Sequence, residues 1–357
     1  MDYSPLKILF LGETYRADAQ TWIRGIEQAS HLSLHTDEVQ QSDSRLLRAF
    51  RFLELIFKYA LNPSKFKYDI VIAERSTSYG LISCFVNTQV RIVAQQGATD
   101  LFPGKWHQRL YKGFVQKFVY RKADLIHAWG SNMALHMRSI GVPKEKILVL
   151  SKGIDLSVFK FQSNHVNRHD TWKIVVTRSL EPYYGYLNIL SACDDLIKSG
   201  VDLELHIIGS GSMLDKLKQF TKLRGIETQV IFHGRLGAMD ISEVLQSSQI
   251  YLSAPTTEGH SSSLLEAMAC GCLPIVSDLP ANSALINNGA NGFLFQVNDV
   301  SDMVACIHKG MLNYHHMMLS LESNRRYIEE QADYTKNMAL FWRRYKELLI
   351  QRQSTTS

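Results

Sequence analysis

Short apolar runs rich in β-branched residues alternate with longer amphipathic stretches along almost the whole chain. Each short run has the length of a buried strand, and each longer stretch has the periodicity of a helix that packs by one face. Strands that alternate with helices form parallel sheets covered on both faces. The chain is therefore predicted to be an α/β protein built from doubly wound sheets.

Eleven of the short runs are predicted to be strands. They are residues 6–11, 33–36, 70–73, 91–94, 125–128 and 147–150 in the first half, and 172–177, 203–208, 230–233, 250–253 and 274–276 in the second. The alternation starts again after residue 160, so each half has the strands for a sheet of its own.

The length of 357 residues exceeds what one core of ordinary size holds, so two domains are expected. We predict Rossmann-like domains at residues 1–160 and 161–333, and a C-terminal helix at 334–357 that crosses back to the first domain. The polar segment KFQSNHVNRHDT, residues 160–171, is the predicted linker. A ligand in such a fold lies outside the carboxyl ends of the strands, in the cleft between the domains.

The composition is that of an ordinary globular protein, with 45% apolar and 20% charged residues. The opening run LKILFLG is far too short to span a bilayer and follows no basic stretch. We expect a cytoplasmic protein without a secretory signal or a membrane span.

Five cysteines are present, an odd number, and they are scattered along the chain, which favours reduced thiols. They are Cys84, Cys193, Cys270, Cys272 and Cys306. Cys270 and Cys272, with His260 nearby, leave a metal site open as an alternative. A CxC pair without a second pair of ligands is more typical of packing at a helix end.

The stretch EGHSSSLLEAMACGC, residues 258–272, carries the strongest chemical signal. A strand ends before it and a helix begins at its serines, so the first amides of that helix are free to bind a phosphate. Glu258 precedes the helix, and Glu266 lies about one and a half turns into it, where a carboxylate can accept the two hydroxyls of a ribose. The spacing predicts a nucleotide sugar, although a helix start with two solvated glutamates has the same pattern.

The segment TEGHSSSLLEAMACGCLPIVSD resembles the donor-site signature of the retaining glycosyltransferases of family 4, in which two glutamates stand eight positions apart. Further likenesses follow in the family's order: KGIDLSVF at 152–159, TRSLEPYYG at 177–185, LHIIGSGSM at 205–213, VIFHGR at 230–235 and NGFLF at 291–295. The resemblance covers residues 145–310 well and the first half only in general layout. It implies the GT-B fold, with two facing Rossmann-like domains, and a transferase of the hexosyltransferase type.

The resemblance also implies roles for particular residues. Glu258 would lie near the transferred sugar, and Arg178 would neutralise the diphosphate, since a guanidinium is always charged and binds phosphate bidentately. Glu266 would bind the ribose. The remaining predicted donor-site residues are Gly259, His260, Ser261, Ser262 and Ser263 at the helix start, Gly209 and Gly211 in a close-approaching turn, Arg235 near the base, and Tyr184.

Two positions depart from the family pattern. Tyr184 precedes Gly185 where the family usually has a lysine, so a second cation is missing, although some members with a similar segment share this change. Gln96 stands where a catalytic-site histidine is often found, and a glutamine cannot take a proton. The leaving phosphate would then act as the base, as in the front-face mechanism proposed for this fold.

No metal or other cofactor is implied, because no two aspartates stand two positions apart as in the DxD motif of other glycosyltransferases. Helix amides and Arg178 would supply the electrostatic stabilisation instead. The acceptor is expected on the first domain, where Gly12, Glu13 and Thr14 follow the first strand. An ordinary strand-to-helix turn has the same sequence there.

The two halves of the chain differ in charge. Residues 1–160 have 22 basic and 14 acidic residues, whereas the rest of the chain has 17 basic and 20 acidic residues. Residues 105–122, KWHQRLYKGFVQKFVYRK, have six basic residues, no acidic residue and interleaved aromatic residues. A helix with this pattern suits an anionic membrane surface, with a solvated basic face as the alternative. No recognised nucleic-acid module is present.

The leading prediction is a metal-independent, retaining glycosyltransferase that moves a sugar from a nucleoside-diphosphate sugar to a lipid-linked or growing glycan acceptor, in cell-envelope or extracellular polysaccharide biosynthesis at the inner face of the membrane. The alternative is an inactive glycosyltransferase-like binding subunit, motivated by Tyr184 and Gln96. A nucleotide-linked dehydrogenase is a weaker alternative, because GSG at 209–211 is followed by Leu214 and not by a third small residue. The sequence does not specify base, sugar, acceptor, linkage or oligomeric state.

Overall fold

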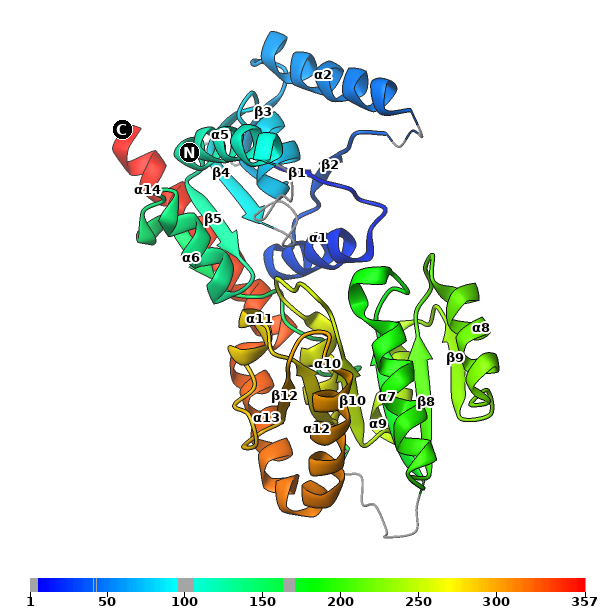
Figure 1. The fold of residues 1–357 in the computed structure, drawn as a ribbon. Helices are drawn as coiled ribbons and strands as arrows, with labels where there is room; N and C mark the ends of the chain where they lie inside the picture. The colour runs from blue at the N-terminus through cyan, green and yellow to red at the C-terminus, as the bar shows by residue number, and fades with distance from the viewer. Residues whose placement is uncertain (1–5, 41, 43, 96–105, 163–170, 357) are drawn as a thin grey trace. The chain divides into compact units, whose positions relative to one another are not determined.

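A computed structural model describes residues 6–40, 42, 44–95, 106–162 and 171–356 of the chain, and its ribbon is shown in Figure 1. The chain forms two compact units, one made of residues 1–152 and 334–357 and the other of residues 153–333. Each unit contains one parallel six-stranded sheet with helices packed on it. The α/β class and the two doubly wound sheets predicted from the alternation are confirmed.

The sheet of the first unit has the strand order β2-β1-β3-β4-β5-β6. Its strands are β1 (Ile8–Leu11), β2 (His35–Asp37), β3 (Lys67–Glu74), β4 (Asn87–Gln95), β5 (Leu125–Ala128) and β6 (Ile147–Val149). The described helices are α1 (Ala17–Ser30), α2 (Arg45–Leu61), the π-helix η1 (Arg75–Tyr79), α3 (Gly80–Ser83), α5 (Trp106–Lys122), α6 (Ser131–Ser139), η2 (Lys144–Lys146) and α14 (Tyr334–Thr356).

The sheet of the second unit has the order β12-β11-β10-β7-β8-β9. Its strands are β7 (Trp172–Thr177), β8 (Leu203–Ile208), β9 (Val230–Gly234), β10 (Ile250–Ser253), β11 (Leu273–Ser277) and β12 (Phe293–Phe295). The helices are η3 (Pro182–Tyr184), α7 (Tyr186–Lys198), α8 (Leu214–Arg224), α9 (Ala238–Ser247), α10 (Ser262–Cys270), α11 (Pro280–Ser283), α12 (Val300–Asn313), η4 (Tyr314–Met317) and α13 (Met318–Gln331). The strand order reverses between β7 and β10, and open α/β sheets bind ligands at such a switch point.

All eleven predicted strands are present: four have the predicted bounds, and the ends of the others differ by at most four residues. β3 and β4 begin earlier than their apolar runs, because polar residues such as Asn87 and Thr88 continue the ladder where its end meets solvent. The strand β12 was not predicted. It pairs with β11 at the edge of the sheet.

The boundary between the units lies after Lys152 and not at residue 160. Ile154 pairs with Asp333, and its amide donates to the carbonyl of Ala332 at 2.7 Å. Phe159 is buried in the core of the second unit. These contacts fix residues 153–160 to the second unit, whereas residues 163–170 of the predicted linker lie outside the described residues.

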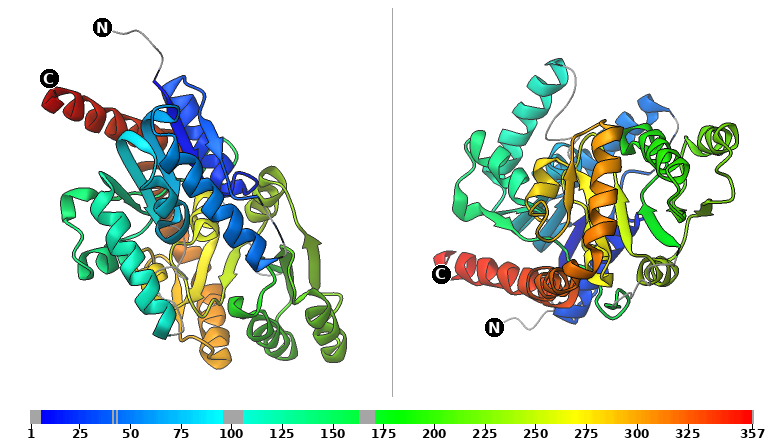
Figure 2. Two further views of the ribbon diagram at one scale, coloured as in Figure 1. Left: turned by 90° about the horizontal axis from the view of Figure 1, so that it is seen from above. Right: turned by 60° about the horizontal axis from the view of Figure 1, so that its bottom comes forward.

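The C-terminal helix α14 packs in the core of the first unit, beside α1. Tyr334 donates to the carbonyl of Thr21 at 2.8 Å, and Phe341 and Tyr345 are fully buried. Phe341 lies against His127 of β5, with ring centroids 4.4 Å apart. Figure 2 shows the two units and α14 from two further directions.

Candidate active site

The candidate site of the second unit lies at its switch point, where the segments after β7 and β10 come together. Arg178 follows β7 directly, and Glu258 and Ser261 stand between β10 and α10. The two segments are tied by a hydrogen bond of 2.9 Å from the amide of Thr256 to the carbonyl of Tyr183. The fold therefore joins residues 80 positions apart in the sequence at the edge where ligands bind.

Ser261 is the N-cap of α10, and its hydroxyl accepts from the amide of Leu264 at 3.2 Å. The amides of Ser262 and Ser263, in the first turn, have no partner within the helix. The hydroxyl of Ser263 donates to the carbonyl of Thr177 at 2.9 Å, so it ties α10 to β7. The predicted helix start is confirmed, and its anion-attracting end faces the segment that carries Arg178.

Arg178 is held by two residues of the loop before α10. Its guanidinium forms an ion pair with the carboxylate of Glu258 and donates to Ser261 Oγ at 2.6 Å. Arg178 and Glu258 expose only 12% and 10% of their side chains. Burial alone lowers the pKa of Arg178, but Tyr251 and Glu258 outweigh it and raise the net pKa above the ordinary value. The guanidinium is therefore a permanent positive charge in a nearly dry setting.

The carboxylate of Glu258 also accepts from the amide of Gly259 at 3.1 Å. It thus lies between a buried cation and a backbone N–H. Burial raises the pKa of Glu258, and Arg178 opposes that shift. Both Arg178 and the Gly259 amide, which the sequence predicts to bind a diphosphate, are paired here with one carboxylate.

Glu266, in the second turn of α10, has no hydrogen-bond or ion-pair partner among the residues that the structure describes. Burial raises its pKa to about 7, and Arg178 partly opposes the shift. A carboxyl group with unused acceptor oxygens beside a buried arginine is available to a ligand's hydroxyls.

Tyr184, which stands where the family usually has a lysine, lies against the same arginine. The Arg178 guanidinium is 5.1 Å from the centre of its ring, a cation–π arrangement. Burial raises the pKa of Tyr184 to about 12, so its hydroxyl remains neutral. The side chain orients Arg178 but adds no positive charge.

The predicted glycines of the β8–α8 turn are required by a neighbouring backbone. A Cβ on Gly209 would lie 2.1 Å from the carbonyl of Arg178, and one on Gly211 would lie 2.5 Å from that of Leu180. The family resemblance implies that this turn closely approaches the nucleotide. In the structure the turn supports the segment that carries Arg178, so packing also accounts for the GSG pattern that suggested a dehydrogenase.

The structure also places the two remaining predicted donor-site residues. Arg235 follows β9 and is exposed. His260 lies in the loop before α10 and is half-buried. One further residue of the site was not predicted: Tyr186, whose hydroxyl donates to the carbonyl of Arg178 at 2.6 Å. No sequence signal separates Tyr186 from an ordinary core aromatic residue.

The segment 158–333, which contains this site, matches the sequence profile described as glycosyl transferases group 1. The second unit belongs to the group 1 glycosyltransferase family. This confirms, at the level of the family, the resemblance on which the sequence analysis depends.

Individual relatives agree with this assignment. The chain is 31% identical over 169 residues to an uncharacterised glycosyltransferase of Haemophilus influenzae, with 47% of each chain covered. It is 24% identical over 179 residues to a UDP-Gal:alpha-D-GlcNAc-diphosphoundecaprenol alpha-1,3-galactosyltransferase of Escherichia coli, covering 47% of this chain and 46% of the relative. The chain thus spans about half the length of the curated relatives it matches.

The solved structure of HepE from Anabaena, in complex with UDP, matches with a TM-score of 0.74. The match covers 96% of this chain and 100% of HepE at 14% identity. This likeness confirms the predicted GT-B fold class.

The alternative metal site at the CxC pair of the glycosyltransferase unit is not supported. Cys270 ends α10 and Cys272 follows it, whereas His260 precedes the helix. Both thiols are buried, and Cys272 donates to the carbonyl of Leu245 at 3.1 Å. Within the described ranges no group of three or more His, Cys, Asp or Glu side chains is placed to hold a metal ion. The cysteines pack the helix end.

In the first unit, the predicted acceptor residues Gly12, Glu13 and Thr14 lie after β1, beside the end of β3. Glu13 is buried, and its carboxylate accepts from Arg75 at 2.8 Å. Arg75 has a φ of 57°, a left-handed backbone that L-residues rarely adopt and that is frequent at functional sites. Gln96 lies outside the described residues.

Residues 106–122 form α5, and the described side chains of this helix point in two directions. Leu110, Tyr111 and Phe114 are more than 60% exposed, whereas Val115 and Val119 are buried. In the part of the chain that the structure describes, no helix has the length and apolar composition to cross a bilayer.

Proposed function

We propose that the chain is a retaining, metal-independent glycosyltransferase that moves a sugar from a nucleoside-diphosphate sugar to a lipid-linked or growing glycan acceptor, in cell-envelope or extracellular polysaccharide biosynthesis. The observation that carries this proposal is the buried arginine, Arg178, held by Glu258 and Ser261 at the start of α10. HepE, whose fold the chain shares, was solved with UDP, and this supports a nucleoside diphosphate as the leaving group.

In this proposal the diphosphate takes the place of the Glu258 carboxylate on Arg178 and on the amide of Gly259, and it also binds the amides at the start of α10. Arg178 and the Gly259 amide already bind one anion, and Arg178 Nε is a buried donor without a hydrogen-bond partner in the described part of the chain. The ribose lies near Glu266, and the sugar lies beside the released Glu258. One arginine and one helix end then supply the charge that other enzymes obtain from a metal ion.

The proposed reaction breaks the bond between the anomeric carbon and the phosphate oxygen. The acceptor oxygen forms its bond to that carbon on the same face, so configuration is retained. The acceptor proton passes to the departing diphosphate, which leaves as the nucleoside diphosphate. Arg178 stabilises the charge that grows on the leaving oxygen, and such an interaction lowers the barrier because it strengthens in the transition state.

Tyr184 is the specific observation that favours the alternative, an inactive binding subunit. The tyrosine packs against Arg178 and supplies no second cation. An inactive subunit would still bind the nucleotide, because Arg178, Glu266 and the helix start are in place, but it would not transfer sugar.

We further propose that the acceptor is held on the first unit near Gly12, Glu13 and Thr14, and that residues 105–122 bring that unit to the inner face of the membrane. Exposed Phe114 and the basic residues of α5 support this contact. The relative from Escherichia coli is named for a diphosphoundecaprenol-linked acceptor, which supports a lipid-linked acceptor here.

The proposal is tested by incubating the pure protein with radiolabelled nucleotide sugars and a lipid-linked acceptor, with and without EDTA. We expect transfer from one donor, unchanged by EDTA, with an α-anomeric product from an α-linked donor by NMR. Binding of the nucleotide without transfer would support the inactive subunit. Loss of transfer with EDTA and its return with magnesium would contradict metal independence.

A further inference from the structure

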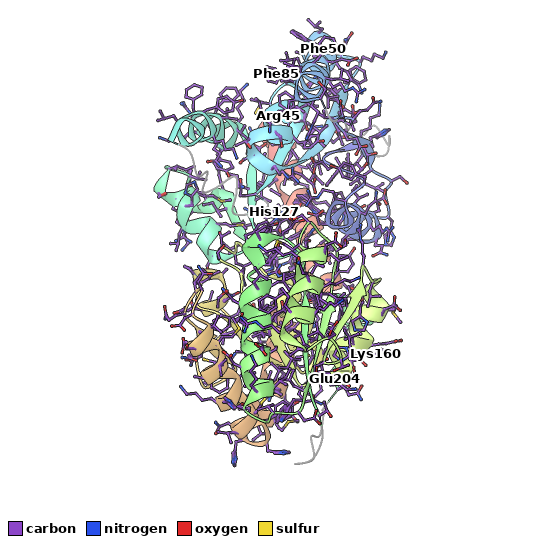
Figure 3. All side chains as sticks on the ribbon, turned by 45° about the vertical axis from the view of Figure 1, so that its right-hand side comes forward. Arg45, Phe50, Phe85, His127, Lys160 and Glu204 are labelled. Carbon is purple, nitrogen blue, oxygen red and sulfur yellow. The ribbon has the colours of Figure 1, made fainter. Side chains whose placement is uncertain are left out.

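The outer side of α2 carries a stripe of large apolar side chains that remain in contact with solvent. Its members are Leu46, Phe50, Leu53, Phe57 and Leu61, each between 50% and 85% exposed. Their spacing of three and four residues places them along one face of the helix. Figure 3 labels Phe50 and, near the start of the same helix, Arg45.

The opposite side of α2 already holds the helix on its sheet. Leu55 and Tyr59 are buried with Leu11 of β1 and Val71 of β3. Both residues lie about half a turn away from the exposed stripe, since successive helical residues are about 100° apart. One apolar face is enough for folding onto a sheet, so the second face has no role within the unit.

Helix α5 has the same two-sided arrangement. Val115 and Val119 face the sheet, and Leu110, Tyr111, Phe114 and Phe118 are exposed. Together, α2 and α5 carry ten of the 22 exposed large apolar side chains in the described residues. This concentration marks an interaction surface, because single exposed apolar residues are ordinarily scattered.

The two helices cover the same face of the sheet. A Cβ on Gly80 would meet both Val119 of α5 and Val93 of β4, so α5 packs on the side of Val93. Val93 pairs in register with Ala73, which belongs to the cluster under α2. The view from above in Figure 2 shows α2 and α5 on the viewer's side of these strands.

The charge of the two helices indicates which kind of partner this surface fits. Their sequences contain nine lysines and arginines and one acidic residue, Glu54. Lys58 pairs with Asp37, but Arg45, Lys117 and Arg121 are exposed. Apolar tips between basic side chains suit an anionic bilayer, where the tips enter the acyl boundary and the cations meet phosphates. A second copy of this surface would bring like charges together.

We propose that α2 and α5 form a docking surface for an anionic lipid bilayer, in which the stripe of α2 is the principal apolar contact. This extends the proposed membrane contact of residues 105–122 to a second helix. The biological purpose of this docking surface rests on the proposed function. Its binding to vesicles does not, because that binding is measured without nucleotide sugar or acceptor. Failure of vesicle binding and failure of sugar transfer are therefore distinguishable.

The test is sedimentation of the full chain with vesicles of phosphatidylcholine, alone or with 30% phosphatidylglycerol. The variant Phe50→Ser/Phe57→Ser removes two members of the α2 stripe, and Phe114→Ser removes one apolar tip of α5. Leu223→Ser/Leu312→Ser is the matched control, since both leucines are at least 78% exposed on the other unit. Unfolding curves check that every variant is folded.

We expect the wild type and the control to bind the anionic vesicles, and the α2 variant to bind at least tenfold more weakly. Absence of wild-type binding, or loss in Phe114→Ser alone, would overturn the role of α2. A wild-type dimer in sedimentation equilibrium that the α2 variant dissociates would also overturn it, in favour of a second copy.

A second readout does not depend on removing the stripe. All five cysteines are buried, so Phe50→Cys can be labelled selectively with an environment-sensitive dye. Anionic vesicles should shift the emission of the dye to the blue, whereas the same dye on Leu312→Cys should not respond. A label on Phe50→Cys that remains in water would contradict the proposal.

Discussion

Glu266 is a carboxyl group whose surroundings disfavour its charge, and this has a consequence for stability. Burial raises its pKa from 4.5 to about 7. Between those values the folded state holds a proton that the unfolded state has lost, so stability falls as the pH rises from about 4.5 to 7. One pKa unit corresponds to about 1.4 kcal/mol, which limits the loss to about 3 kcal/mol.

Replacing Glu266 with Gln removes this titration. We predict that the free energy of unfolding of the wild type falls by about 2 to 3 kcal/mol more between pH 5 and pH 8 than that of Glu266→Gln. Urea unfolding at the two pH values measures the difference. Parallel pH profiles would show that Glu266 titrates normally.

Glu258 occupies the positive groups of the site, so its replacement should act on the reaction more than on nucleotide binding. We predict that Glu258→Gln lowers kcat at least tenfold and changes the Kd of the nucleoside diphosphate less than threefold, because the diphosphate replaces the carboxylate on Arg178. Steady-state kinetics and calorimetry give the two quantities. Equal losses in both would contradict this division.

The contacts of individual side chains were the feature least predictable from the sequence. Arg178, Glu258 and Ser261 were all named in advance, but the resemblance gave their roles and not their contacts. The link from Arg178 to Ser261 depends on where the ends of β7 and β10 meet, which is a property of the sheet order. Tyr186 has no motif that distinguishes it from a core residue.

At the scale of elements, the turns around Arg178 are fixed by close backbone contacts. A Cβ on Gly185 would lie 2.2 Å from the carbonyl of Ala254, so the start of α7 presses on the segment after β10. Gly225, at the end of α8, has nearly the same φ, 69° against 66°, and open space around it. A comparison of alanine substitutions at the two positions therefore separates the effect of steric overlap from the effect of backbone strain.

We therefore predict that Gly185→Ala destabilises the protein by about 1 to 3 kcal/mol more than Gly225→Ala, the typical cost of overpacking. Gly185→Ala should also weaken nucleotide binding, because it displaces the segment leading to Glu258. Thermal unfolding with and without nucleotide measures both effects. Equal melting points for the two variants would show that the segment yields without cost.

Most of the strands were predictable, because their apolar runs are visible in the sequence. Strand β12 was not predicted, although β2 and β6 are equally short. The position of the boundary between the two units was not predicted either. KGIDLSVF looks like a connecting turn, and only the packed structure shows Ile154 and Phe159 buried in the second unit.

At the scale of the whole molecule, the first unit is completed by the last helix of the chain. Phe341 is fully buried against His127 and Trp129, residues more than 200 positions earlier in the sequence. Phe→Ala substitutions at such sites cost about 3 to 5 kcal/mol. The sequence predicted that this helix crosses back to the first domain, but not which of its residues complete the core.

We predict that Phe341→Ala lowers the stability of the first unit by that amount, whereas Leu340→Ala, at a 38% exposed neighbour, costs less than about 1 kcal/mol. Unfolding followed by tryptophan fluorescence measures both, since Trp22 and Trp129 lie in the same core. Similar effects of the two variants would contradict the packing of α14 on this unit.

The central claim is that the start of α10, Arg178 and Glu266 form the binding site of a nucleoside diphosphate, and thermal unfolding tests it most directly. The wild type, Arg178→Ala, Glu266→Ala and the exposed control Glu227→Ala would be heated with UDP, GDP, ADP, dTDP or CMP. At a hundredfold excess over Kd, binding stabilises by about 2.7 kcal/mol, or several degrees in Tm. We predict that one diphosphate raises the Tm of the wild type and of Glu227→Ala, and leaves that of the two site variants unchanged. No shift with any of the five nucleotides, or an equal shift in all four proteins, would contradict the account.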